Sequence, residues 1–167
     1  MRTLLTPLLG VVSFSACGSC TDALVSAGTE KVTGVRVSND DTTVTYKTKD
    51  GTLSMGAGVK APTDLPVKAP ADAVIVMSTQ AQGQSMVVFT TNQSVEALAE
   101  QYEKDLTGRS FKVERAEQHM AELTLISLSF RGSLEGGVQL QHQTPTDDDS
   151  GPHTSVTVSW MTSKPTE

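Results

Sequence analysis

The chain has 167 residues, 37% of them hydrophobic and only 4% aromatic, and its formal net charge is −6. This length is enough for one domain with a hydrophobic core, and the low aromatic content leaves few side chains to line a small-molecule pocket. The negative charge argues against nucleic acid as a partner and against adhesion to an anionic membrane through a basic patch.

A short apolar segment opens the chain and ends at Cys17. Arg2 and the amino terminus give it a positive start, residues 4–14 form a mainly apolar stretch, and Ser15 and Ala16 are small. The apolar stretch is shorter than the roughly 20 residues that span a bilayer, so it is typical of a signal peptide. The pattern resembles the lipobox of bacterial lipoprotein signal peptides.

This resemblance implies that residues 1–16 are removed, that Cys17 is acylated, and that its lipid, palmitate for example, holds the chain in a bacterial cell envelope. The mature chain then has 12 basic and 19 acidic residues, a formal charge of −7. An acidic residue directly after the acylated cysteine would resemble an inner-membrane retention signal. The residue here is Gly18, and this favours the outer membrane. Phe14 stands where the lipobox usually has leucine. Two alternatives stay open: a secretory peptide cleaved after Ala16, or a buried first strand.

Cys20 has no partner in the chain if Cys17 carries lipid, and it would then be an unpaired thiol near the membrane. Without lipidation, a bridge between the two cysteines would close a very small loop and stabilise little. Their Cys-x-x-Cys spacing also occurs in redox and metal sites, but no helix pattern follows it here. Residues 17–31 are small and polar, which predicts a flexible tether.

A β-hairpin region is predicted after the tether, over residues 32–60. Strands are expected at 32–37 and 42–48 around an Asn-Asp-Asp turn, and a Lys-Asp-Gly turn leads into a third strand at 52–55. Three prolines within nine residues then exclude a helix or a central strand. Residues 62–72 are therefore expected to cross the fold as an extended segment that separates the hairpin from the rest.

Two near-continuous apolar runs follow, at 73–78 and 85–90. They predict strands covered on both faces, and residues 80–84 connect them.

One amphipathic helix is expected at 94–106, with Asn92 as its N-cap and Gly108 ending it. Glu100 and Lys104 form an i,i+4 pair of opposite charge on its polar face. Its apolar side chains recur at helical spacing and form a single stripe: Val95, Leu98, Ala99, Tyr102 and Leu106.

Four antiparallel strands are predicted after the helix, at 111–116, 122–130, 137–143 and 154–161. The second of them does not alternate, which indicates either a central strand covered on both faces or a bulge near Ile126. The order of elements predicts an α+β fold, an antiparallel sheet with one amphipathic helix packed on one face, preceded by a β-hairpin.

This fold is expected to form a single domain over residues 32–162. Its core, residues 73–162, has the order β-β-α-β-β-β-β, and residues 163–167 form a tail.

A second set of motifs begins with a proline-rich lead at Pro62, Pro66 and Pro70. Tyr102 is an aromatic residue late in the helix, and Phe111 is an aromatic residue after its end. Over about residues 62–161 these motifs resemble the sheet-and-helix module of many bacterial lipoproteins. Gln101 and Tyr102 stand where the module has a Phe-Tyr pair, and Phe111 stands where it has tryptophan. The resemblance implies a fold and carries no catalytic residues.

The sequence contains no recognisable catalytic constellation. Ser85 lacks the second glycine of a nucleophile elbow and falls inside an apolar strand. The glycine pairs Gly56 with Gly58 and Gly136 with Gly137 lack the context of a phosphate-binding loop, so turns are expected there.

A second set of candidate metal ligands lies at the 142–153 hairpin. His142 and His153 would lie opposite each other across the ladder, and Asp147 or Asp149 would complete a transition-metal site. The aspartates also resemble a calcium loop, but its later acidic ligand is missing. An exposed histidine pair at a solvated hairpin tip is the simpler interpretation, so we expect no metal and no other cofactor.

We therefore expect a lipid-anchored envelope protein that is not an enzyme and whose domain binds an envelope protein partner or supports an assembly. A binding module predicts a continuous apolar or aromatic patch on the sheet face that the helix leaves open. An enzyme would need a cleft of coupled titratable groups, and a metal-binding or enzymatic site at residues 142–153 is the alternative. A structural spacer predicts neither feature.

Overall fold

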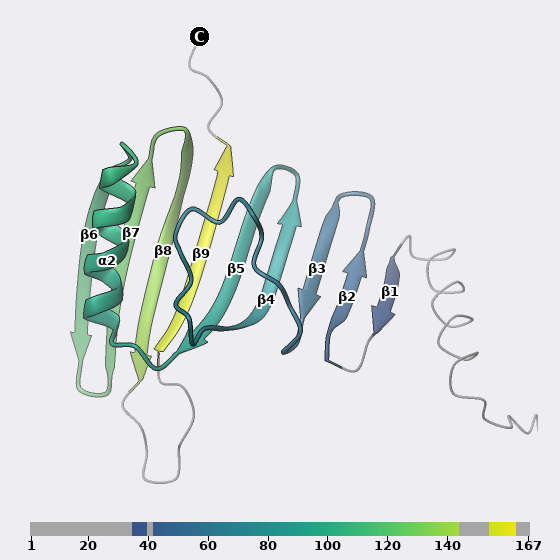
Figure 1. The fold of residues 1–167 in the computed structure, drawn as a ribbon, viewed down its shortest axis with the longest axis horizontal. Helices are drawn as coiled ribbons and strands as arrows, with labels where there is room; N and C mark the ends of the chain where they lie inside the picture. Colours follow the sequence, from purple (N-terminus) through teal and green to yellow (C-terminus); the bar gives the residue numbers. More distant parts are fainter. Residues whose placement is uncertain (1–34, 40–41, 144–153, 163–167) are drawn as a thin grey trace, which may run out of the picture.

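The computed structural model describes residues 35–39, 42–143 and 154–162, which form nine strands and one helix (Figure 1). The helix is α2 (Val95–Gly108). The strands are β1 (Arg36–Asn39), β2 (Val44–Lys47), β3 (Gly51–Met55), β4 (Val74–Ala81), β5 (Gln84–Thr91), β6 (Lys112–Met120), β7 (Leu123–Arg131), β8 (Leu134–Gln143) and β9 (Thr154–Thr162). The expected combination of an antiparallel sheet with one helix is confirmed in this part of the chain, although strands dominate it.

All nine strands belong to one sheet with the order β1-β2-β3-β4-β5-β9-β8-β7-β6, and every neighbouring pair is antiparallel. The predicted hairpin region belongs to this same sheet. Strand β3 pairs with β4 from Gly51 opposite Ala81 to Met55 opposite Met77. The proline-rich segment therefore separates the hairpin from the rest in sequence but not in space.

One face of the sheet, the near face, is covered by α2 and by residues 56–73 (Figure 1). The helix connects β5 to β6, which run parallel because four antiparallel steps separate them, and it packs on β6, β7 and β8. The connection is a right-handed crossover, the usual hand for parallel strands of one sheet. Residues 56–73 run over β5 and β9, beside the helix. The opposite side, the far face, has neither cover.

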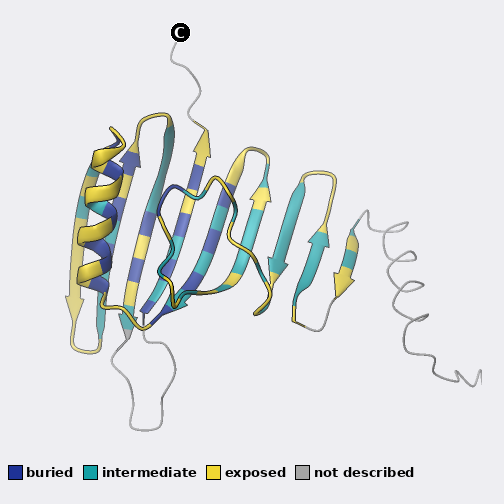
Figure 2. Ribbon diagram, viewed as in Figure 1, coloured by how far each residue is buried: buried dark blue, intermediate teal, exposed yellow. Residues whose placement is uncertain are grey.

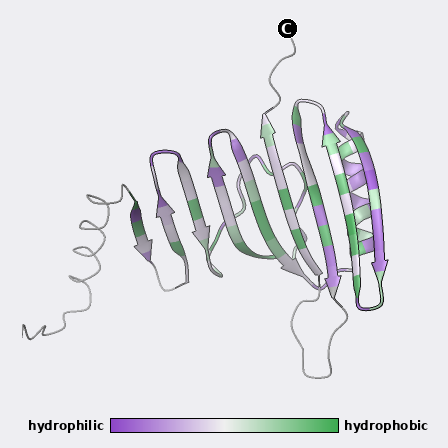
Figure 3. Ribbon diagram, turned by 180° about the vertical axis from the view of Figure 1, so that it is seen from behind, coloured by the Kyte–Doolittle hydropathy of each residue, from purple (hydrophilic) through white to green (hydrophobic). Residues whose placement is uncertain are grey.

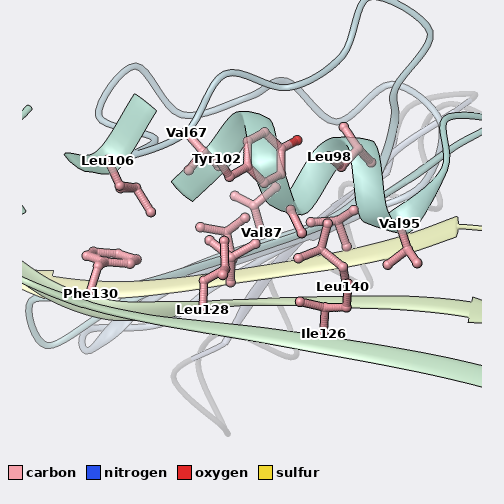
Figure 4. Close-up of a cluster of buried hydrophobic side chains, with 14 of the residues drawn as sticks. Val67, Val87, Val95, Leu98, Tyr102, Leu106, Ile126, Leu128, Phe130 and Leu140 are labelled. Carbon is pink, nitrogen blue, oxygen red and sulfur yellow. The ribbon is translucent and has the colours of Figure 1, made fainter. Parts of the chain in front are cut away.

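The hydrophobic core lies between the near face and its covers (Figure 4). All five residues of the predicted helix stripe are buried, which confirms it. In β5 and β9 the buried side chains alternate with more exposed ones, so one face of each strand supplies the core (Figure 2). The strand side chains that meet α2 and residues 56–73 include Val87, Phe89, Ile126, Leu128, Phe130, Val138, Leu140, Val156, Val158 and Trp160.

The N-cap of α2 is Ser94 and not Asn92. The Ser94 backbone is extended, at φ −69° and ψ 145°, and its hydroxyl accepts a hydrogen bond of 3.2 Å from the Ala97 amide. Such an acceptor satisfies one of the amides that a helix leaves unpaired in its first turn. Asn92 lies two residues earlier, and its amide donates to Asp72 Oδ2 at 2.9 Å.

The C-terminal end of α2 also differs from the prediction, because Gly108 is its last helical residue and does not stop it. The chain reverses at Ser110, whose φ is +66°, so serine occupies the left-handed conformation usually taken by glycine. The Phe111 amide then bonds to the Leu106 carbonyl at 3.1 Å. The predicted pair of Glu100 with Lys104 is not among the ion pairs within the described ranges.

The proline-rich segment is a crossing segment without helix or strand, as predicted, and it is fixed to the core. Pro66 and Val67 are buried. Trp160 Nε1 on β9 donates to Asp64 Oδ2 at 3.2 Å, and Arg109 donates to the Pro66 carbonyl. These bonds attach the segment to the sheet and to the end of the helix.

Two strand predictions need correction. Strands β4 and β5 are longer than predicted and are joined by a two-residue turn, where Gln82 and Gly83 have φ of +51° and +79°, as type I′ hairpins require. Neither strand is buried on both faces. In β7 there is no bulge at Ile126, since its register with both neighbours is regular.

Candidate functional site

The far face of the sheet is the candidate site, because no element of the described chain covers it (Figure 3). The strand register shows which side chains share this face, since residues opposite each other in a ladder point to the same side. One far-face row crosses the whole sheet, through Val37, Tyr46, Leu53, Thr79, Met86, Ser159, Gly137, Ser129 and Glu114. The row is apolar at the β1 end, small and polar in the middle, and charged at the β6 end.

The N-terminal half of the far face is an apolar patch. Met55 is 38% exposed and Val74 47% exposed, and the other members are half-buried. The patch consists of Val37, Val44, Tyr46, Leu53, Met55, Val74, Met77, Met86 and Val88. The register places no charged residue on the far face of β1 to β5, so no charged side chain interrupts the patch.

On β2 and β3 the polar residues occupy the near face instead. Thr45 and Ser54 face each other across this pair, and their hydroxyl oxygens lie 3.1 Å apart in a hydrogen bond. On the opposite side of the same strands Tyr46 lies opposite Leu53. The apolar side of the sheet is therefore the near face under α2 but the far face in β1 to β3.

A bulge in β4 lies where the two arrangements meet. Its register with β5 shifts between Ile75, opposite Phe89, and Met77, opposite Val88. Ile75 packs against the core on the near face, whereas Met77 belongs to the far-face patch. The extra residue, Val76, shifts the alternation, so Met77 lies on the same face as Val74 and on the face opposite to Ile75.

The C-terminal half of the far face contains shallow hollows around Gly137. A hollow of about 250 Å³ is lined by small polar side chains of β7, β8 and β9, and one of about 350 Å³ adjoins it beside Met86 and Met161. A third, of about 500 Å³, extends to the charged end of the sheet. The first of them forms because Gly137 has no side chain and because Ser129 and Ser159, its neighbours across the ladders, are short.

The charged side chains beyond these hollows form a rim and make ion pairs with one another. Arg131 bonds to Glu135 at 2.9 Å, and Lys112 lies 3.4 Å from Glu114. All four side chains are well exposed, so each pair contributes little to stability. The C-terminal half of the far face therefore ends in charged side chains, whereas the N-terminal half is apolar.

On the near face of β6, Arg115 forms ion pairs with Glu103 of α2 and with Glu117. Hydrogen bonds from His119 and Arg115 hold the pKa of the Glu117 carboxyl below its usual range. These side chains join the helix to the edge strand and do not surround a cavity.

The candidate metal ligands lie partly outside the described residues. His142 is at the end of β8, opposite Thr154, and its Nδ1 lies 3.4 Å from the Thr154 hydroxyl. His153, Asp147 and Asp149 fall outside the described ranges, as do Cys17 and Cys20. Within those ranges, no group of three or more His, Cys, Asp or Glu side chains is placed to hold a metal ion.

The serine and the glycines considered as candidates in the sequence have structural explanations. Ser85 is a buried residue on the near face of β5. Gly136 lies inside β8 with Gly137, so the predicted turn there is wrong. A Cβ on Gly136 would lie 2.8 Å from Phe130 Cζ and 2.1 Å from the Ser159 carbonyl oxygen, so only glycine fits. Gly56 does lie in a turn, at φ +117°.

Comparison of the chain with protein-family models, with curated proteins and with solved structures finds no match. Among the described residues no helix is long and apolar enough to cross a membrane. The far-face patch has a signal in the sequence, because Val44 and Tyr46 alternate with polar residues. The sequence does not reveal on which face of the sheet these apolar side chains lie.

Proposed function

We propose that the chain is a bacterial envelope lipoprotein, anchored through lipid on Cys17, whose domain binds a partner through the far face and catalyses no reaction. The observation that carries the binding role is the apolar patch. A monomeric protein rarely leaves a contiguous apolar surface uncovered unless that surface binds something. Anchoring is supported by the lipobox-like residues that end at Cys17.

The hollows around Gly137 favour binding over a purely structural spacer role. They offer hydroxyl and amide groups from Ser127, Gln139 and Thr157 next to Met86 of the patch. Binding surfaces usually combine an apolar centre with a polar rim in this way. The few titratable groups nearby are exposed and paired with one another, which does not favour an enzymatic role.

The anchor is tested by expressing the full chain with Cys17→Ser in a bacterium. In the unsubstituted protein, the mature N-terminus is expected to be an acylated Cys17 by mass spectrometry, and the protein is expected in the detergent phase. Cys17→Ser should accumulate as precursor or leave the detergent phase, whereas the matched control Cys20→Ser should behave like the unsubstituted protein. Identical partitioning of both variants, with an unmodified N-terminus, would contradict the proposal.

A further inference from the structure

We propose that the partner of the apolar patch is the lipid surface in which Cys17 is anchored, so that the N-terminal half of the far face lies against the bilayer. This inference rests on the proposed anchoring. It assigns an occupant to a sheet face that is otherwise open to water.

The position of the anchor in the chain is the first argument. Only 17 residues separate Cys17 from Val35, and the described sheet begins with β1 directly after Val35. A chain of that length extends at most about 60 Å. The anchor therefore keeps the patch close to the bilayer, and at a high effective concentration a weak contact is enough for docking.

Charge distribution is the second argument. Residues 35–72 contain five basic and five acidic residues, whereas residues 73–162 contain five basic and eleven acidic ones. An anionic lipid surface therefore repels the C-terminal part of the sheet. It does not repel the N-terminal part, in which the basic and acidic residues are equal in number. The net charge of the domain thus favours an orientation with β1 to β3 nearest the bilayer.

The chemistry of the patch is the third argument. The far face of β1 to β5 has no charged side chain, so contact with lipid requires no charge to be desolvated. Leu53 and Met55 are apolar, and Tyr46 combines an apolar ring with a hydroxyl, as side chains of the membrane interface do.

A second copy of the chain is the competing occupant, and electrostatics disfavours it. Each mature chain has a formal charge of −7, so two copies repel each other when they approach. A bilayer rich in zwitterionic lipid does not impose this cost.

The test uses the full lipidated chain, with Cys20→Ser and one new cysteine that carries an environment-sensitive fluorophore. Met55→Cys reports on the far face, and Ser38→Cys is the matched control on the exposed near face of β1. Both proteins are reconstituted into vesicles of phosphatidylethanolamine and phosphatidylglycerol, with or without nitroxide-labelled lipid. We expect a blue shift at position 55 and at least threefold stronger quenching there than at position 38. Adding Leu53→Glu should abolish the difference while Trp160 fluorescence shows that the fold persists.

Equal, weak quenching at both positions in protein that still floats with the vesicles would overturn docking and leave the lipid anchor intact. Failure of the protein to float would instead contradict the proposed anchoring. A blue shift at position 55 that grows with protein density and is insensitive to nitroxide lipid would identify a second copy as the occupant and also overturn the proposal.

Discussion

Ile75 and Met77 are two residues apart in β4 but point to opposite faces of the sheet, because the register with β5 shifts between them. In a regular strand residues at this spacing share a face. Ile75 joins the core under residues 56–73, and Met77 joins the apolar patch on the far face. The bulge therefore places Met77 in the patch, although Ile75 belongs to the core.

Leu98 is expected to be a major contributor to the contact of α2 with the sheet. It is fully buried at 0% exposure, so Leu98→Ala should lower the free energy of unfolding by about 2 to 5 kcal/mol, through lost transfer energy and the cavity left behind. Chemical denaturation measures this, with exposed Gln101→Ala as the control. A loss below about 0.5 kcal/mol, typical of surface sites, would show that the helix face is misassigned.

Tyr102 should tolerate the loss of its hydroxyl but not of its ring. Its oxygen is buried and has no hydrogen-bond partner among the described residues, and burial raises the pKa of the phenol. Tyr102→Phe should therefore leave the free energy of unfolding unchanged or raise it by up to about 1 kcal/mol. Tyr102→Ala should lower it by about 3 to 5 kcal/mol. A clear loss in the phenylalanine variant would reveal a partner for the hydroxyl.

Ser94 and Asn92 provide a matched pair for the start of α2. Ser94→Ala removes the acceptor of the Ala97 amide and should lower the free energy of unfolding by about 1 kcal/mol. Asn92→Ala should change it by less than about 0.5 kcal/mol, because the bond to Asp72 comes from its backbone. The reverse order in thermal or chemical unfolding would restore Asn92 as the cap.

Asp72 should make stability fall at low pH. Hydrogen bonds from the Asn92 amide and the Thr91 hydroxyl lower the pKa of Asp72 below its ordinary value of 3.8. The unfolded chain therefore binds this proton more readily, so the contribution is complete above pH 3.8 and is lost as pH falls through the lowered pKa. Asp72→Asn should flatten the fall of unfolding free energy below about pH 4. Parallel curves for the variant and the unsubstituted protein would contradict the role of Asp72.

The sequence predicts local elements well and their faces less well. The helix stripe ending at Leu106 and the alternation around Val156 and Val158 are readable because each pattern repeats several times within one element. The exact cap is not readable, since Asn92 and Ser94 are both good N-caps and the choice depends on Asp72, 20 residues away from Asn92.

The far-face patch is harder to predict because it depends on long-range pairing. Tyr46 and Leu53 alternate with polar residues in short strands, but alternation alone does not say which side faces the helix. That side is set by the pairing of β3 with β4 and by the bulge at Val76, which has no turn residue to mark it. Gly136 is mistaken for a turn residue for a similar reason, since it is required by Phe130 and Ser159, which lie in other strands.

If the far face is the binding surface of the chain, site-specific photocrosslinking in intact bacteria should show it. A photoreactive amino acid is placed at Leu53 or Gln139 on the far face, and at Thr52 or Gln101 on the other side of the domain. We expect abundant adducts to lipid or envelope protein from the two far-face positions and few from the other two. Adducts mainly from Thr52 and Gln101, with Leu53 and Gln139 inert, would contradict the claim.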